Sequence, residues 1–256
     1  DRQMDALLRS SEGWFSAIYL SLCSFAERGV LSDENSDIYQ MFTSALIDPL
    51  AEDEQEFLAM MSLADEFTAE MARRITGRDD VETMLTGLTE QNAFVTRLPD
   101  GVTYRFHHMM KECAQREFRA MAGEKQTVYC GRFGVWYERH GQYLHAIGAY
   151  AASGDCGAVL RVIERDAGIL MASLDPEDVL AFLEKCPVSV LKEHPLALLV
   201  LMRRMFTWRQ IPKMMELKAL LEAAVREHPD MPQAERGDLM GECDLIMSFL
   251  YYNDIR

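Results

Sequence analysis

The residues of this chain that could take part in chemistry gather in one short segment. Two adjacent histidines, His107 and His108, stand where a β-prone stretch ends and a helical pattern begins, in the run Tyr104-Arg-Phe-His-His-Met-Met110. A histidine in this position can cap the helix or form a polar edge. It can also donate a hydrogen bond to an anion held near the amides of the first helical turn. We take His107 as the candidate ligand-binding residue and keep the capping role open beside it.

The histidines and cysteines do not predict a metal site. Because His107 and His108 are consecutive, their side chains on a helix would diverge by about 100°. His140 and His145 flank Gly141 with no cysteine pair nearby. The six cysteines form no CxxC pair and fall in apolar periodic segments, which is typical of buried thiols in a reducing, cytoplasmic compartment: Cys23, Cys113, Cys130, Cys156, Cys186 and Cys243.

No catalytic residue and no cofactor site is predicted within the chain itself. The sequence contains none of the GxxxxGK[ST], GxGxxG or GxSxG patterns that cradle a phosphate or expose a nucleophilic serine. Carboxylates such as Asp53, Glu54 and Glu56 are spread over what we interpret as a solvated helix face. We therefore expect the chain not to be an enzyme, and an enzyme with a dispersed site stays open as the weaker alternative.

The charge and the hydropathy pattern limit the possible partners. The chain has 41 aspartates and glutamates against 26 lysines and arginines, a formal net charge of -15, and such a surface repels nucleic-acid phosphates. No apolar run approaches the roughly 18 to 20 residues that span a bilayer, since the best candidate, 196–202, is too short. Neither direct DNA binding nor membrane insertion is expected of these residues.

The first half of the chain predicts short helices followed by one β-hairpin. The hairpin has β-prone stretches at 93–98 and 102–106 around the turn Pro99-Asp-Gly101. Thr68 and Asp79 are the expected N-caps of the last two helices before it. The predicted helices cover residues 13–26, 38–50, 52–64, 68–75 and 79–92. Several short helices followed by a hairpin is the order of a winged helix.

The second half predicts helices joined by short turns, so the expected fold class is mainly α. Paired helices of this kind indicate helical repeats, although no fixed period is visible. Proline at the first turn, as at Pro176, marks one of the helix starts. The predicted helices cover residues 107–121, 124–139, 142–153, 156–165, a segment from 176 onward, 195–208, 211–227 and 233–253.

A winged helix often binds DNA, but the expected recognition helix here is unsuited to it. Residues 79–92 contain Asp79, Asp80, Glu82 and Glu90 and no basic side chain. A helix without lysine or arginine cannot make the usual contacts in the major groove. We expect this domain to make intramolecular contacts instead.

Five segments in a fixed order resemble the middle of the large LuxR-family regulators that are similar to MalT. These regulators belong to the signal-transduction ATPases with numerous domains, the STAND class. The resemblance covers residues 8–165 best and the remainder only by its helical character. The segments are Ser11-Glu-Gly-Trp14, Leu88-Thr-Glu-Gln-Asn-Ala-Phe-Val95, Tyr104 to Met110, Trp136-Tyr-Glu-Arg-His-Gly141 and His145 to Asp155.

The resemblance implies an architecture. Residues 1–30 would be the last helices of an ATPase module, 36–122 a winged-helix domain, 123–185 a helical arm and 186–256 the start of a TPR-like superhelical sensor domain. The chain does not begin with methionine, and both ends look like cuts within a longer protein. The ATPase core would precede it, and a DNA-binding helix-turn-helix would follow it.

The resemblance also implies a role for His107. Related ATPases contain a methionine-histidine-aspartate motif whose histidine contacts the β-phosphate of ADP in the resting state. Phe106-His107-His108 matches this motif only at its middle residue. The implied function is to couple nucleotide state and an inducer, a small molecule or a protein, to oligomerisation and DNA binding by the full-length protein. The alternative is a free-standing helical-repeat scaffold that binds a protein partner.

Overall fold

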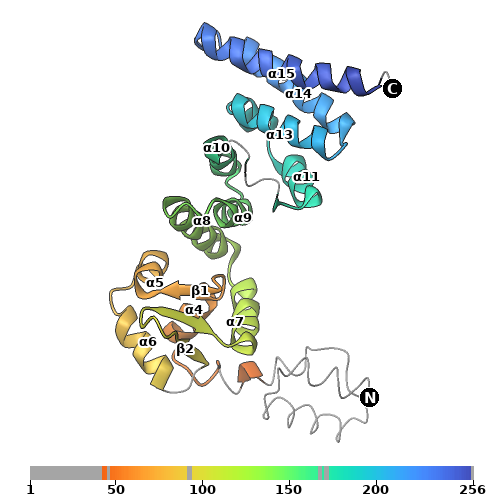
Figure 1. The fold of residues 1–256 in the computed structure, drawn as a ribbon. Coiled ribbons are helices and arrows are strands. Elements are labelled where there is room, and N and C mark those ends of the chain that lie inside the picture. Colours follow the sequence, from red (N-terminus) through yellow and green to blue (C-terminus); the bar gives the residue numbers. More distant parts are fainter. Residues whose placement is uncertain (1–41, 45–46, 91–93, 167–168, 170–172, 255–256) are drawn as a thin grey trace, which may run out of the picture. The chain divides into compact units, whose positions relative to one another are not determined.

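The computed structural model divides the chain into two compact units, residues 1–122 and 123–256 (Figure 1). The structure describes residues 42–44, 47–90, 94–166, 169 and 173–254. The predicted ATPase-module helices at 1–30, with Cys23, lie outside these residues. Of the helix predicted over 38–50, residues 42–44 are helical and the described remainder forms a turn.

The first unit has the element order of a winged helix, which confirms the predicted fold. A helix, a short strand and two further helices precede a β-hairpin, and another helix follows it. The elements are α4 (Glu52–Met61), β1 (Glu66–Thr68), α5 (Ala69–Thr76), α6 (Val81–Glu90), β2 (Val95–Arg97), β3 (Thr103–Phe106) and α7 (His108–Ala120).

The predicted hairpin is present, but it is part of a three-stranded antiparallel sheet. The strand order is β1-β3-β2, with Phe67 opposite Tyr104 and Val95 opposite Phe106. The expectation of a hairpin alone was incomplete because β1 has only three residues, too few to show an alternating pattern. Its backbone partners lie in β3, so only the tertiary structure makes it a strand.

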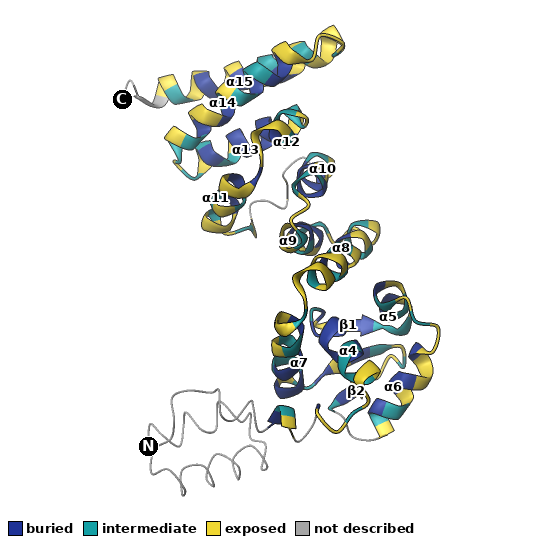
Figure 2. Cartoon of the chain, turned by 180° about the vertical axis from the view of Figure 1, so that it is seen from behind, coloured by how far each residue is buried: buried dark blue, intermediate teal, exposed yellow. Residues whose placement is uncertain are grey.

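Aromatic rings join this sheet to α4. The ring of Phe67 lies 6.5 Å from that of Phe57 on α4 and 5.2 Å from that of Phe106 on β3, measured between centroids. All three side chains are buried, and Figure 2 shows buried residues of the unit gathered between the helices and the strands. This cluster fixes the sheet against the helical layer.

The helix caps before the hairpin agree only in part with the prediction. Thr68 caps α5 as expected, because its Oγ1 accepts a hydrogen bond from the Met71 amide at 3.2 Å. The predicted cap at Asp79 is wrong. Helix α6 begins at Val81, and the carbonyl of Asp80 accepts its first helical bond, from the Met84 amide at 3.0 Å. Arg78 binds the Asp80 carboxylate at 2.7 Å and so holds the residue at the helix start.

The second unit is a succession of helices, as predicted (Figure 1). Tight turns in the left-handed backbone region join several of them, at Gly141 (φ 69°), Gly154 (φ 77°) and Arg209 (φ 58°). The one-turn helix α12 was not predicted, since five residues are too few for a helical period. The helices are α8 (Gly123–Arg139), α9 (Tyr143–Ser153), α10 (Cys156–Asp166), α11 (Pro176–Lys185), α12 (Val188–Lys192), α13 (Pro195–Thr207), α14 (Ile211–Glu227) and α15 (Gln233–Asp254).

One continuous hydrophobic core runs through this unit, from Ala146 on α9 to Met247 on α15. The predicted boundary between an arm and a sensor domain at residues 185 and 186 stays a prediction. The cysteines within the described chain are free thiols, and Cys113, Cys130, Cys186 and Cys243 are buried, as the sequence indicates, whereas Cys156 is only half-buried. Burial raises the pKa of Cys113, Cys130 and Cys243, and that of Cys186 to about 12.

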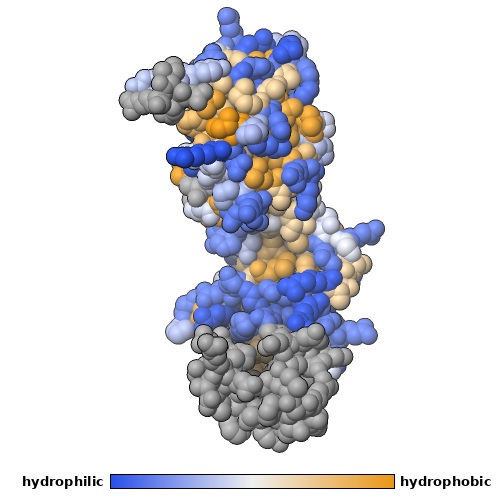
Figure 3. Space-filling model, turned by 90° about the vertical axis from the view of Figure 1, so that its right-hand side faces the viewer, coloured by the Kyte–Doolittle hydropathy of each residue, from blue (hydrophilic) through white to orange (hydrophobic). Residues whose placement is uncertain are grey.

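Apolar and hydrophilic side chains alternate on the face of this unit seen in Figure 3. Near its end, α15 exposes Leu245, Phe249 and Tyr252, each by more than half of its surface. Among the described residues, no helix has the length and apolar character that a bilayer span requires.

One ring and one carboxylate take part in the contact between α8 and α9. The Tyr150 ring packs on Gly134, where any Cβ would lie 2.5 Å from ring carbons. The Tyr150 hydroxyl donates a hydrogen bond to Glu138 Oε2 at 2.7 Å, and Arg161 and Arg165 on α10 reach the same carboxylate at 3.3 and 3.1 Å. Glu138 therefore ties three consecutive helices together.

Replacing Gly134 should destabilise the second unit. In Gly134→Ala the new methyl group would overlap the Tyr150 ring, which is buried and held by its hydroxyl, so we expect a loss of about 1 to 3 kcal/mol in the free energy of unfolding. Gly131→Ala on the same helix is the matched control, because its Cβ would meet the nearest side chain at 4.0 Å. That control should gain about 0.5 to 1 kcal/mol. Urea unfolding of both variants measures the difference, and equal effects would contradict the packing argument.

The charge of Glu138 should make stability depend on pH. Burial alone would raise the pKa of Glu138, but hydrogen bonds from Tyr150 and Arg161 and the charges of Arg161 and Arg165 outweigh it and hold this pKa below its usual 4.5. A depressed pKa stabilises the folded state above the unfolded pKa, and the stabilisation is lost as the pH falls through the folded value.

Glu138→Gln should therefore be less stable than the wild type by about 1 to 3 kcal/mol at neutral pH. The difference should shrink as the pH falls below the usual carboxyl pKa of 4.5. Urea unfolding of both proteins at about pH 7 and about pH 3 tests this, because their other carboxyl groups titrate alike. A difference that stays constant with pH would show that the charge of Glu138 does not stabilise the fold.

Candidate functional site

His107 joins the central strand of the sheet to α7. Its backbone amide donates a hydrogen bond to the carbonyl of Phe94 at 2.7 Å, beside the last residue of β3. Its own carbonyl accepts from the Lys111 amide at 2.9 Å, a bond of the first helical turn. The residue predicted to begin the helix is thus its N-cap, and its backbone is fixed from both sides.

The imidazole of His107 has a defined orientation. Its Nδ1 accepts a hydrogen bond from the Met109 amide at 3.4 Å, so the capping role left open by the sequence is present. The ring also meets Phe94 edge-on at 5.8 Å between centroids. Because Nδ1 acts as an acceptor, the proton of the neutral ring lies on Nε2, which is then a hydrogen-bond donor. The side chain is half-buried.

His108 has different surroundings, and the two histidines diverge as the sequence predicts. Its Nε2 lies 2.9 Å from Glu112 Oε1, one turn further along the exposed face of α7. In the second unit, His140 stacks on Trp136 at 3.9 Å and His145 lies on Tyr137 at 5.2 Å. No group of three histidine, cysteine, aspartate or glutamate side chains that could hold a metal ion occurs in the part of the chain that the structure describes.

The first turns of α7 are firmly attached to the rest of the domain. Met109 and Met110 are buried beneath the helix start. Lys111 forms an ion pair with Asp65, and Gln115 Nε2 donates to the Ser62 carbonyl at 3.1 Å. A group that contacts His107 would therefore act on a rigid part of the winged helix.

Helix α6 occupies the position of a recognition helix but has no basic side chain. Its exposed residues are Glu82, Thr83, Thr86 and Glu90. The nearby Arg73 on α5 forms an ion pair with Glu82, so its positive charge is directed at that carboxylate. The exposed face of α6 is acidic or neutral, which is unfavourable for reading a DNA groove.

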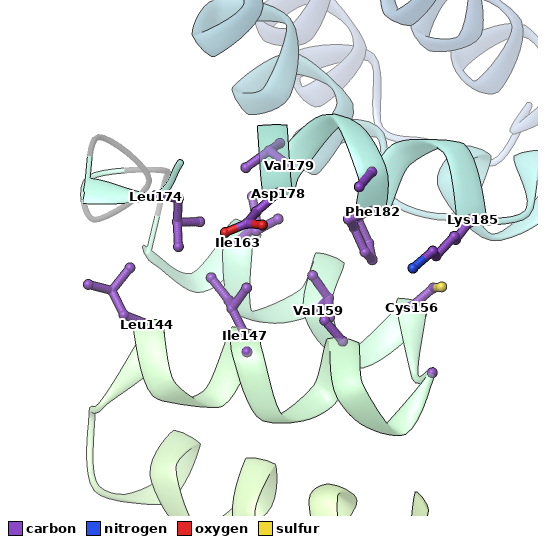
Figure 4. Close-up of a pocket in the computed structure, with 14 residues that line it drawn as sticks. Leu144, Ile147, Cys156, Val159, Ile163, Leu174, Asp178, Val179, Phe182 and Lys185 are labelled. Atoms are coloured by element: carbon purple, nitrogen blue, oxygen red, sulfur yellow. The ribbon is translucent and has the colours of Figure 1, made fainter. Parts of the chain in front are cut away.

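The structure also contains a pocket that no sequence feature predicts. It lies in the second unit between α9, α10 and α11, has a volume of about 430 Å³, and is shown in Figure 4. Among the described residues that line it, Asp178 and Lys185 are the charged ones and most of the others are apolar. The sequence shows three separate apolar helix faces here, and nothing local indicates that they leave a space between them.

These features define a winged-helix domain followed by stacked helices. Residues 43–126 match the family described as the MalT winged helix domain. That span contains α4 to α7, the sheet and His107. This part of the chain is therefore similar to the MalT winged helix domain, and the winged-helix fold implied by the sequence resemblance is confirmed for it.

Similar proteins extend the match beyond this domain. In an alignment of 253 residues that covers 95% of this chain, the sequence is 24% identical to proteins named serine/threonine-protein kinase PknK from two strains of Mycobacterium tuberculosis. The same figures hold for the protein of that name from Mycobacterium bovis. The chain spans 22% of the length of these relatives, about a fifth.

Two substitutions of His107 should separate the stability that comes from capping α7 from the stability that comes from packing of the ring on Phe94. His107→Ala removes the cap and should cost about 0.5 to 1 kcal/mol of unfolding free energy, whereas His107→Asn supplies another good N-cap and should cost little. His108→Ala, next to it and exposed, serves as the control. Thermal unfolding measures all three. If the Asn variant loses as much as the Ala variant, contact with Phe94 rather than the cap stabilises this position.

Proposed function

We propose that this chain is the regulatory and sensing segment of an ATP-dependent transcription activator of the LuxR family, within a longer parent protein of the STAND class. The observation that carries the proposal is the MalT-like winged helix at residues 43–126, followed directly by stacked helices. The segment itself would not be catalytic, since ATP hydrolysis would belong to the ATPase core. The parent would work in the cytoplasm.

His107 is the residue proposed to contact nucleotide. In the resting state its Nε2 would donate a hydrogen bond to the β-phosphate of ADP held by the parent's ATPase core. The tautomer supports this role, because Nδ1 accepts from the Met109 amide and leaves the proton on Nε2. The backbone amides of the first turn of α7 add favourable partial charge for an anion.

The proposed mechanism is a two-state switch. ADP would hold the winged helix against the ATPase core. An inducer bound by the helical segment, together with exchange of ADP for ATP, would release this contact and permit oligomerisation and DNA binding through a helix-turn-helix. A ligand shifts such an equilibrium only by its differential affinity for the two states.

A second candidate output is phosphorylation by an attached kinase. It is favoured by the match over 95% of this chain to relatives named serine/threonine-protein kinase. In that case the same segment would regulate a kinase domain. The reading frame of the parent distinguishes the candidates. A helix-turn-helix in it supports the activator, and a kinase domain supports the second candidate. If the frame encodes neither domain and has no ATPase motif, the free-standing scaffold is the remaining alternative.

The nucleotide role can be tested by ADP release from the full-length parent. His107→Asn keeps the helix cap but removes Nε2, so we expect ADP to dissociate roughly tenfold faster or more, as for loss of a hydrogen bond to a charged group. His108→Ala should leave the rate unchanged. Displacement of a fluorescent ADP analogue measures both rates. If His107→Asn retains ADP as the wild type does, the proposed phosphate contact is wrong.

A further inference from the structure

The pocket of the second unit has the size and walls of a small-molecule site. Its volume of about 430 Å³ falls within the usual range of roughly 300 to 1,000 Å³ for ligand pockets. Ile147 on α9, Val159 on α10 and Phe182 on α11 face one another across it (Figure 4). The three helices belong to one compact unit with one core, so the pocket is part of a single packed body.

Two opposite charges are placed along the same wall. Asp178 and Lys185 are seven residues apart on α11, which corresponds to about 10 Å along a helix axis. In Figure 4 the Asp178 carboxylate lies toward the Leu174 end, and the Lys185 ammonium lies at the other end near Cys156. The pocket is therefore apolar between an anionic and a cationic group.

Asp178 and Lys185 have no charged partner among the described residues, unlike several lysines of the same unit. Lys192, Lys213 and Lys218 form ion pairs with Glu227, Glu216 and Glu222. Among the described residues, which include those of α9, α10 and α11 that line the pocket, neither Asp178 nor Lys185 takes part in an ion pair. Both can thus pair with a ligand without breaking an existing contact.

We propose that this pocket binds a short apolar peptide with free termini, its ammonium group at Asp178 and its carboxylate at Lys185. An extended chain advances roughly 3.3 to 3.6 Å per residue, so three residues span the separation of the two charges. The peptide side chains would lie against Ile147, Val159 and Phe182. Burial of the peptide's apolar side chains supplies most of the affinity, and the exposed charges of Asp178 and Lys185 set the orientation of the peptide.

The site is formed by described residues of α9, α10 and α11 with Leu174, and it involves neither His107 nor nucleotide. Only the further statement that such a peptide would act as an inducer rests on the proposed sensing role. Binding itself is a property of this chain, so failure of a binding test leaves the nucleotide proposal unaffected.

Calorimetric titration of the whole chain with trileucine tests the pocket. Gly148→Leu should reduce the affinity at least tenfold, because Gly148 lines the pocket and a Cβ there would meet no neighbouring atom within 4 Å, leaving room for the new side chain to fill the space. Gly241→Leu on α15 is the matched control, since it is equally open and lies outside the pocket. Thermal unfolding verifies that both variants fold.

The role of the charges is tested with modified peptides. N-acetylation or Asp178→Asn should each weaken binding roughly fivefold, the upper range for an exposed ion pair, and combining them should have no further effect. C-amidation and Lys185→Gln should behave in the same way at the other end. The proposal is overturned if trileucine shows no saturable binding, if Gly148→Leu binds it as the wild type does, or if capped peptides bind equally well.

Discussion

Strand β3 is the element on which the winged helix depends. It pairs with β1 on one side and with β2 on the other, so both rows of its backbone groups are used within the sheet. Its residue Phe106 is in the aromatic cluster with Phe67, and the next residue, His107, caps α7. The position of the candidate nucleotide contact is therefore set by strand pairing and aromatic packing.

In the second unit, the packing of successive helices on one another is the main constraint. Each helix has an apolar face that can be covered only by its neighbours, and the result is one core from Ala146 to Met247. Close approach of α8 to α9 requires a residue without a side chain at Gly134, and Glu138 then links Tyr150 to the arginines of α10. Where α11 packs less closely on α9 and α10, the apolar pocket remains.

Under the two proposals, each unit would offer a different kind of ligand contact. The winged helix presents an imidazole donor at a rigid helix start, which suits a phosphate oxygen. The stacked helices present an apolar space between opposite charges, which suits a short zwitterion. Under the proposed function, ADP and an inducer would favour different states, and these two contacts would bind them.

The sequence by itself determined most of the described helices, the hairpin and the position of His107 at a helix start, because hydrophobic period, turn residues and caps are local properties. Thr68 capped α5 and Pro176 began α11 as the pattern indicates. Strand β1, the start of α6 and the pocket between α9, α10 and α11 were decided only by the tertiary structure. Each requires segments distant in the chain to meet. Strand β1 forms only by pairing with β3, and the start of α6 is held by Arg78, which binds both Asp80 and the distant Asp53. The pocket forms only where three helices pack and leave a space between them.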